Sequence, residues 1–300
     1  MRLVALMSMC FFSKNGACIL ETTKELFRTG ITAIYLYCLN FLFIRKSLLY
    51  IITKIIFAII IPHHNLSDMK LSKNQDFLNP ERTIADEIRD THKAQADLWQ
   101  GVSAFSAIKN CVTVYGSARF REGDKYYELA RAMGKELAKH KFTVMTGGGP
   151  GVMEAANRGA KEGGGLSIGC NIILPFEQAP NLYVDRMVSF EFFFTRKVIL
   201  RKNSVAYVLM PGGFGTMDEI FEVLSLIQTH KLPPRPVVCL GKEYWKHLGT
   251  FIRETMIEMK TISMDDLDLM MVTDDPVEAV AYISKNLVKG SATQAEVAEE

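Results

Sequence analysis

Residues 205–219 limit the folds open to this chain, because an apolar run there leads directly into a glycine-rich turn. The run VAYVLM has the continuous apolar character of a strand buried on both faces of a parallel sheet. The next residues, PGGFGT, contain three glycines, which allow the backbone to turn tightly and to approach a ligand closely. The segment therefore predicts a buried strand, a tight turn and a following helix.

The start of that helix is a candidate anion site. We expect the helix to begin at Thr216, where a hydroxyl, free backbone N–H groups and the helix dipole favour a phosphate. Glu219 follows in the first helical turn, so its carboxylate would reach the group attached to that phosphate. The alternative is an ordinary strand-to-helix turn, with Thr216 and Glu219 forming a capping box.

The rest of the chain alternates between predicted strands and predicted helices. We expect strands at 111–115, 142–145, 166–173, 188–190, 205–210, 237–240 and 269–272. We expect helices at 124–140, 152–162, 191–203, 216–230, 244–259 and 276–287. This alternation predicts an α/β fold, a Rossmann-like doubly wound parallel sheet with helices on both faces. The turns at Gly116, Gly147 and Gly212 all follow strands, so they would converge on one cleft at the carboxyl edge.

The turn at residues 147–151 indicates the class of ligand. It reads GGGPG, but Val152 stands where a dinucleotide fingerprint has its third glycine, and no Walker lysine follows. Two glycine turns, each between a strand and a helix, favour a mononucleotide or a sugar phosphate over NAD or a triphosphate.

Composition excludes several classes of protein. A net charge of +2 over 300 residues gives no sign of nucleic-acid binding. The six cysteines form no CxxC pair, so we expect reduced thiols rather than a disulfide framework or a zinc site, and no metal cluster is apparent. Residues 289–300 are small and polar, and we expect a disordered tail.

Residues 1–68 form a hydrophobic N-terminal extension unlike the rest of the chain. Each apolar piece is shorter than the roughly 20 residues of a membrane span, and joining them would bury Arg45 and Lys46 near the bilayer centre. Three interpretations stay open: a membrane anchor or hairpin, an ordered extension packed on a partner, or a segment absent from a mature protein that starts at Met69. We favour the last, because Met69 opens an ordinary polar sequence.

Residues 69–107 form a leading helical segment. Thr83 is placed to cap a helix that contains Ile84 and Ile88. We expect this helix to cover one edge of the sheet, and the alternatives are a dimer arm or a lid over the site.

Two motifs in order carry a resemblance to the LOG family, whose members are often labelled lysine decarboxylase-like. Residues 211–219 match its PGGxGTxxE motif, and residues 147–153 match its GGGxxGxM turn. Arg196 and Lys197 match the Arg-Lys pair in the helix before the signature strand. The resemblance covers roughly residues 108–288 and implies one Rossmann-like nucleotide-hydrolase domain.

The resemblance also implies an activity. Members cleave the N-glycosidic bond of a nucleoside 5′-monophosphate and release the free base and ribose 5-phosphate. It implies that Glu219 and Arg196 are catalytic. A carboxylate beneath the ribose stabilises the positive charge that builds there and can activate water, and Arg196 would hold the ribose or the phosphate and orient Glu219. The decarboxylase label lacks support, because that chemistry needs pyridoxal phosphate on a distinctive lysine, so we expect no cofactor.

The remaining candidates line the substrate. We expect the 5′-phosphate on Gly212, Gly213, Gly215 and Thr216. The other substrate-binding candidates are Gly148 and Gly149 on the ribose side, Gly116, Ser117 and Arg119 at the phosphate end, and Lys197 and Asp218. Asp218 would accept from a ribose hydroxyl or only complement the helix dipole, and Lys197 is expected to face solvent or partners rather than the chemistry. Phe190, Phe192, Phe193 and Phe194 include candidates to stack on the base, although core packing is the commoner fate, and Glu154 and Asn157 are weaker candidates to meet the ligand.

The sequence therefore predicts a hydrolase, with a purine nucleoside monophosphate, AMP-like or N6-modified as in cytokinins, as its substrate. We expect a cytoplasmic homodimer without nucleic-acid partners, membrane-associated only if residues 1–68 are native. The alternative is a non-catalytic nucleotide-binding or carrier module of the same fold.

Overall fold

The computed structural model describes residues 76–174 and 179–297. The three interpretations of residues 1–68 lie outside the described residues. Within the described ranges, no helix is long and apolar enough to cross a membrane.

In the part of the chain that the structure describes, seven parallel strands form one sheet in the order β4-β3-β2-β1-β5-β6-β7. The strands are β1 Cys111–Tyr115, β2 Thr143–Thr146, β3 Ser167–Ile172, β4 Arg186–Phe190, β5 Ser204–Leu209, β6 Val237–Leu240 and β7 Met271–Thr273. The chain adds β1 to β4 in one direction and then returns to β1 to add β5, β6 and β7 in the other. The point of reversal lies between β1 and β5, and doubly wound sheets bind ligands beyond the carboxyl ends of the strands at such a point.

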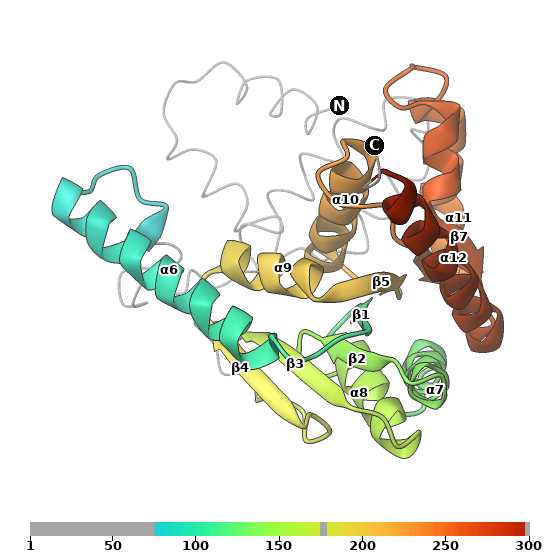
Figure 1. Ribbon diagram of the computed structural model, residues 1–300, viewed down its shortest axis with the longest axis horizontal. Helices are drawn as coiled ribbons and strands as arrows, with labels where there is room; N and C mark the ends of the chain where they lie inside the picture. Colours follow the sequence, from blue (N-terminus) through green and yellow to red (C-terminus); the bar gives the residue numbers. More distant parts are fainter. Residues whose placement is uncertain (1–75, 175–178, 298–300) are drawn as a thin grey trace, which may run out of the picture. The chain divides into compact units, whose positions relative to one another are not determined.

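Helices cover both faces of the sheet, which confirms the predicted Rossmann-like α/β fold (Figure 1). One apolar core joins alternate strand residues such as Val112 and Val208 to α7 Lys125–Lys139, α8 Val152–Glu162 and α12 Pro276–Val297. The other core joins the residues between them, such as Tyr115 and Leu209, to the second set of helices. That set is α6 Ile84–Phe105, α9 Phe193–Lys202, α10 Phe214–Gln228 and α11 Lys242–Thr250. The alternation between faces follows from the two-residue period of a strand.

The predicted elements are all present, with differences at their ends. Thr83 caps α6 in a capping box with Asp86, as its sequence predicts. The helix expected to reach residue 259 instead ends at Thr250 and continues as the π-helical turn Phe251–Met256. The 3₁₀-helix Met264–Leu269 then precedes β7. Helix α12 is assigned to Val297, beyond the predicted end at Leu287.

Three cysteines, Cys111, Cys170 and Cys239, are buried in the second core as free thiols. Burial raises the pKa of the Cys111 and Cys239 thiols to about 12, which keeps them protonated and unreactive at neutral pH. These three therefore agree with the predicted structural thiols, and the other cysteines lie outside the described residues.

Candidate active site

Three turns meet at the carboxyl edge of the sheet, as predicted. They follow β1, β2 and β5, which are neighbours in the order β2-β1-β5. The Ser117 N–H donates to the Pro211 carbonyl at 3.0 Å, and the Val152 N–H donates to the Ser117 carbonyl at 2.9 Å. The turn after β1 is thus bonded to both of the others. A Cβ on Gly151, whose φ is +70°, would lie 2.4 Å from the Ser117 carbonyl oxygen, so only glycine allows this close approach.

Helix α10 begins earlier than its sequence predicts. Its first residue is Phe214 and its N-cap is Gly213, so Thr216 lies within the first turn rather than at its start. The prediction was wrong because it took the hydroxyl residue as the cap, although glycine also serves as an N-cap. Glu219 consequently lies in the second turn, and no side chain caps this N-terminus. The expected capping box between Thr216 and Glu219 is therefore not formed.

The N-terminus of α10 is open to a ligand. A Cβ added at Gly213 or Gly215 would have no heavy-atom neighbour within 4 Å, and Phe214 is 97% exposed. The turn itself is held from behind, because the Tyr244 hydroxyl of α11 donates to the Gly212 carbonyl. Backbone N–H groups that face open space at the positive end of a helix dipole form an anion site.

Arg196 and Glu219 form an ion pair between α9 and α10. Arg196 Nη2 lies 3.0 Å from Glu219 Oε1, and the two side chains are 10% and 11% exposed. Arg196 Nε also donates to the Cys170 carbonyl of β3 at 2.9 Å. A Cβ on Gly147 would lie 2.6 Å from Arg196 Nη2, so the guanidinium packs directly on the second turn. The pair therefore lies where the turns after β2 and β5 come together.

Two effects act on the pKa of Glu219 in opposite directions. Burial raises the pKa of Glu219 above its ordinary 4.5, and the charge of Arg196 partly offsets this effect. Tyr115, the last residue of β1, is also affected, because burial and the nearby Glu219 charge raise the pKa of its phenol. Tyr115 is thus a neutral neighbour of Glu219 that the motifs did not identify. In the sequence, only its position directly before the Gly116 turn indicates that it lies near the site.

Lys197 and Asp218 pair with each other. Lys197 Nζ lies 2.9 Å from Asp218 Oδ2 and 3.0 Å from Glu222 Oε2. Arg201 also pairs with Glu222. These contacts join α9 to α10 beside the Arg196–Glu219 pair, and they satisfy the charges of two predicted substrate-binding residues without a ligand. Lys197 is therefore less exposed to solvent than its sequence predicts.

A buried polar network holds the second turn. The Asn157 amide accepts from the Thr146 hydroxyl at 2.6 Å and donates to the Ser167 hydroxyl at 2.7 Å. The Gly148 N–H donates to Thr146 Oγ1 at 2.9 Å. The Asn181 side chain donates both to Asn157 Oδ1 and to the Gly149 carbonyl, each at 3.0 Å. Asn157 is fully buried, so it shapes the turn and does not meet a ligand as expected.

The first and second turns border a cavity of about 590 Å³. Arg119 lines it, together with Pro150 and Gly151 of the second turn and Glu154 of α8. Glu154 accepts a hydrogen bond from the Tyr127 hydroxyl at 2.9 Å. Ser117 Oγ accepts from the Arg119 N–H at 3.1 Å, so the hydroxyl shapes the turn that carries Arg119. Arg119, a predicted substrate-binding residue, therefore lies at a cavity beside the turns.

The predicted aromatic cluster divides into two pairs. Phe190 and Phe192 are fully buried in the protein and cannot stack on a base, whereas Phe193 and Phe194 are each 41% exposed.

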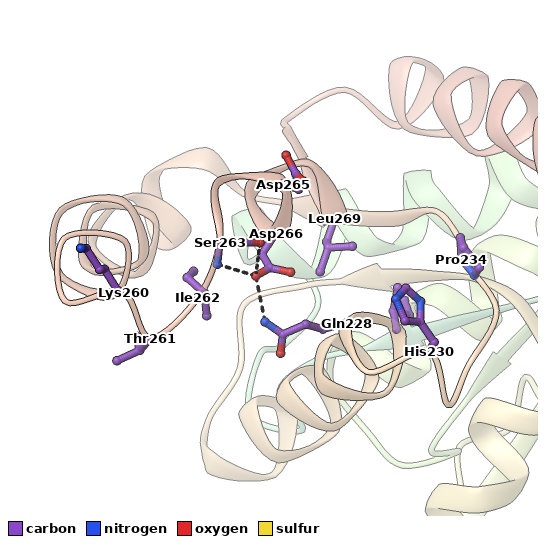
Figure 2. A pocket seen from close by; sticks show the side chains of 11 residues that line it. Gln228, His230, Pro234, Lys260, Thr261, Ile262, Ser263, Asp265, Asp266 and Leu269 are labelled. Carbon is purple, nitrogen blue, oxygen red and sulfur yellow. Dashed lines mark hydrogen bonds between the residues drawn. The ribbon is translucent and has the colours of Figure 1, made fainter.

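A second cavity, of about 680 Å³, lies at the other end of α10 (Figure 2). There Asp266 Oδ2 accepts from Gln228 Nε2 at 2.9 Å and from the Ser263 N–H at 2.7 Å. The 15 residues of α10 separate this cavity from the glycine turn by roughly 20 Å at the usual helical rise. Its lining residues include none of those predicted to bind substrate.

Comparisons with known proteins agree with the motifs. A family model described as "Possible lysine decarboxylase" matches residues 153–283. The chain is 30% identical over 159 residues to the "Cytokinin riboside 5′-monophosphate phosphoribohydrolase" of Mycobacterium tuberculosis (strain ATCC 25618 / H37Rv), covering 51% of this chain and 82% of that protein. It is 29% identical over 154 residues to the protein of the same name from Rhodococcoides fascians, covering 49% of this chain and 76% of that protein.

Solved structures also match. A "Moco Carrier Protein" from Chlamydomonas reinhardtii is 28% identical with a TM-score of 0.43, covering 60% of this chain and 99% of that one. The molybdenum cofactor binding protein of Rippkaea orientalis is 22% identical with a TM-score of 0.46, covering 61% of this chain and 99% of that one.

Proposed function

Because this chain belongs to the LOG family, we propose that it hydrolyses the N-glycosidic bond of a purine nucleoside 5′-monophosphate. The products are the free base and ribose 5-phosphate. The substrate class follows the names of the two relatives from Mycobacterium tuberculosis and Rhodococcoides fascians, which are cytokinin riboside 5′-monophosphate phosphoribohydrolases. AMP or an N6-modified AMP is the proposed substrate.

The observation that carries this proposal is the buried Arg196–Glu219 ion pair against the Gly147 turn. As the glycosidic bond breaks, its electron pair leaves with the base nitrogen and positive charge builds on the ribose. A carboxylate held in a site shielded from water stabilises that charge more strongly than an exposed one. Arg196 favours the ionised form of Glu219 and fixes its orientation, so the carboxylate is ready before the substrate binds.

Water completes the reaction at the anomeric carbon. Its oxygen forms the new bond to that carbon, and Glu219 accepts one of its protons as general base. The departing base takes up one proton, and Glu219 releases the one it accepted, so each cleaved bond consumes one water molecule. Glu219 thus serves as charge stabiliser first and as base afterwards.

The phosphate is proposed to bind at the N-terminus of α10. The first N–H groups of α10, near Gly213, Gly215 and Thr216, lack partners within the helix, and the helix dipole favours the phosphate charge. Arg119, which lines the neighbouring cavity, would supply a cation at this end. Gly148 and Gly149 would then face the ribose, because they follow β2 next to the pair.

The lysine next to the candidate site does not suit a pyridoxal-dependent decarboxylase. A pyridoxal Schiff base needs a lysine that readily loses its proton. Lys197 is the lysine next to the Arg196–Glu219 pair. Burial lowers its pKa, but hydrogen bonds to Asp218 and Glu222 outweigh this effect and raise the pKa above its ordinary value. Its surroundings therefore favour the charged amine.

The test is release of adenine from AMP by the full chain, followed by chromatography, with Glu219→Gln as the matched inactive control. The proposal predicts equal amounts of adenine and ribose 5-phosphate from the wild type. Bound AMP with no adenine release would instead favour the non-catalytic carrier module. A panel of AMP, N6-isopentenyl-AMP, GMP and CMP would then identify the preferred base.

A further inference from the structure

Helix α9, which carries Arg196, has no N-terminal cap of its own. It spans only Phe193–Lys202, and its N-cap residue is Phe192, whose side chain makes no capping hydrogen bond. The first N–H groups of any helix lack partners within it, and leaving them buried without partners destabilises the helix. The cap must therefore come from elsewhere in the chain.

Asp97 of α6 supplies that cap. Its carboxylate oxygens accept from the Glu191 N–H at 3.2 Å, and Oδ2 accepts from the Phe192 N–H at 3.3 Å. Oδ2 also accepts from the Thr195 hydroxyl. Asp97 is buried, and a buried carboxylate at the positive end of a helix dipole is well placed to fix the start of that helix.

These bonds reach Arg196 through a short path. The Phe192 carbonyl accepts from the Arg196 N–H at 3.2 Å, and the Thr195 hydroxyl that donates to Asp97 also lies 2.8 Å from this carbonyl oxygen. Asp97 holds both the N–H of Phe192 and the hydroxyl of Thr195. The backbone of Arg196 is therefore one hydrogen bond removed from the residues that Asp97 fixes.

One face of α6 packs against α9. Asp97, Gly101 and Phe105 are spaced four residues apart, so they share a helix face. A Cβ on Gly101 would lie 2.6 Å from Ile199 Cγ1, and the Phe105 carbonyl accepts from Asn203 Nδ2 at 3.1 Å. The helices thus contact each other at the start, middle and end of α9.

We propose that Asp97 is a positioning residue: by capping α9 from α6, it fixes the Arg196 guanidinium between the Gly147 turn and Glu219. This inference rests on the proposed hydrolase function. It gives the leading helix a role in the chemistry, although α6 lies outside residues 153–283 that the family model matches.

The test compares Asp97→Ala and Asp97→Asn with two controls. Asp97→Ala removes every cap contact and should lower kcat/KM by about 10- to 100-fold, because small displacements of a positioned group are costly in catalysis. Asp97→Asn keeps one acceptor oxygen and should fall between Asp97→Ala and wild type. Glu87→Gln removes a carboxylate from α6 that is half exposed and does not contact α9, and Asn203→Ala breaks the contact at the far end of α9. Both controls should keep kcat/KM close to wild type.

A pH profile separates positioning from general loss of stability. If Arg196 moves away from Glu219, its charge no longer lowers the pKa of Glu219, so the acid limb of kcat/KM should move to higher pH in Asp97→Ala. A lower melting temperature with an unchanged acid limb and unchanged kcat would overturn the proposal. So would an equal loss of activity in Asn203→Ala.

NMR titration of the Glu219 carboxyl carbon measures the effect of Arg196 on the pKa of Glu219 without turnover. The Glu219 signal is assigned by its absence from the spectrum of Glu219→Gln. A wild type that releases no adenine would refute the hydrolase function alone. An unchanged Glu219 titration in Asp97→Ala would refute the positioning role alone.

Discussion

The ion pairs Arg196–Glu219 and Lys197–Asp218 join α9 to α10 one residue apart on each helix, and their surroundings differ. Arg196 and Glu219 are 10% and 11% exposed, and the guanidinium also bonds to the Cys170 carbonyl. Lys197 and Asp218 are 17% and 56% exposed, and Lys197 pairs both with Asp218 and with Glu222. Neighbouring residues on a helix point about 100° apart, so one pair faces the turns and the other faces outward.

The comparison shows that burial, and not charge, distinguishes the two pairs. An exposed ion pair is screened by water and contributes little. A buried pair keeps a strong field but depends on both partners, because removing one leaves an uncompensated charge. The account therefore assigns the chemistry to Arg196 and Glu219, and the joining of the two helices to Lys197 and Asp218.

Glu219→Gln should have the largest effect. It keeps the shape of the side chain but removes the charge that stabilises the ribose cation, so we expect kcat for AMP to fall by about 10²-fold or more. Steady-state kinetics at saturating AMP measure it. Near-normal turnover would remove Glu219 from the mechanism.

Arg196→Ala should be almost as damaging, with the fold intact by circular dichroism. We expect a loss in kcat/KM of about 10²-fold, because Glu219 loses both its orientation and its counter-charge. The acid limb should also move to higher pH, since the charge of Arg196 lowers the pKa of Glu219. Arg196→Lys keeps the charge, so its acid limb should lie close to that of the wild type even though its rate stays low. Ordinary activity in Arg196→Ala would show that the pair has been misassigned.

The wild-type pH profile should reflect the buried carboxylate. Burial raises the pKa of Glu219, and only its ionised form can stabilise a cation, so kcat/KM should fall as pH decreases through a midpoint above 4.5. Stopped assays from pH 4 to 8 would measure this midpoint. A midpoint at or below the ordinary value of a glutamate would mean that another group controls the reaction.

Asp218→Asn should have the smallest effect. Its carboxylate is more than half exposed, so we expect a change in the free energy of unfolding of at most about 1 kcal/mol and a kcat close to wild type. Urea titration and the AMP assay measure the two quantities. A loss in kcat equal to that of Glu219→Gln would abolish the distinction between the pairs and restore Asp218 as a substrate ligand.

Local patterns were enough to predict the sheet, its helices and the meeting of three turns. Apolar runs and glycine turns are short-range signals, and the carboxyl ends of parallel strands lie at one edge by geometry. The start of α10 was missed because a hydroxyl residue near a helix start is a stronger sequence signal than the glycine that serves as its cap.

Contacts between distant segments could not be predicted in the same way. The cap from Asp97 to α9 joins residues 98 positions apart in sequence, and the Asn157–Asn181 network joins a helix to a later loop. The ion pair between Lys197 and Asp218 depends on how α9 and α10 face each other. No local spacing encodes these contacts, so the motifs identified the pair but not its supports. The homodimer and the cytoplasmic location stay predictions.

The most direct measurement is a crystal structure of Glu219→Gln with AMP bound. We expect phosphate oxygens within hydrogen-bonding distance of the N–H groups at the start of α10. We also expect the anomeric carbon to face residue 219 and Arg196. AMP bound with its ribose away from residue 219, or in the cavity at the far end of α10 (Figure 2), would contradict it.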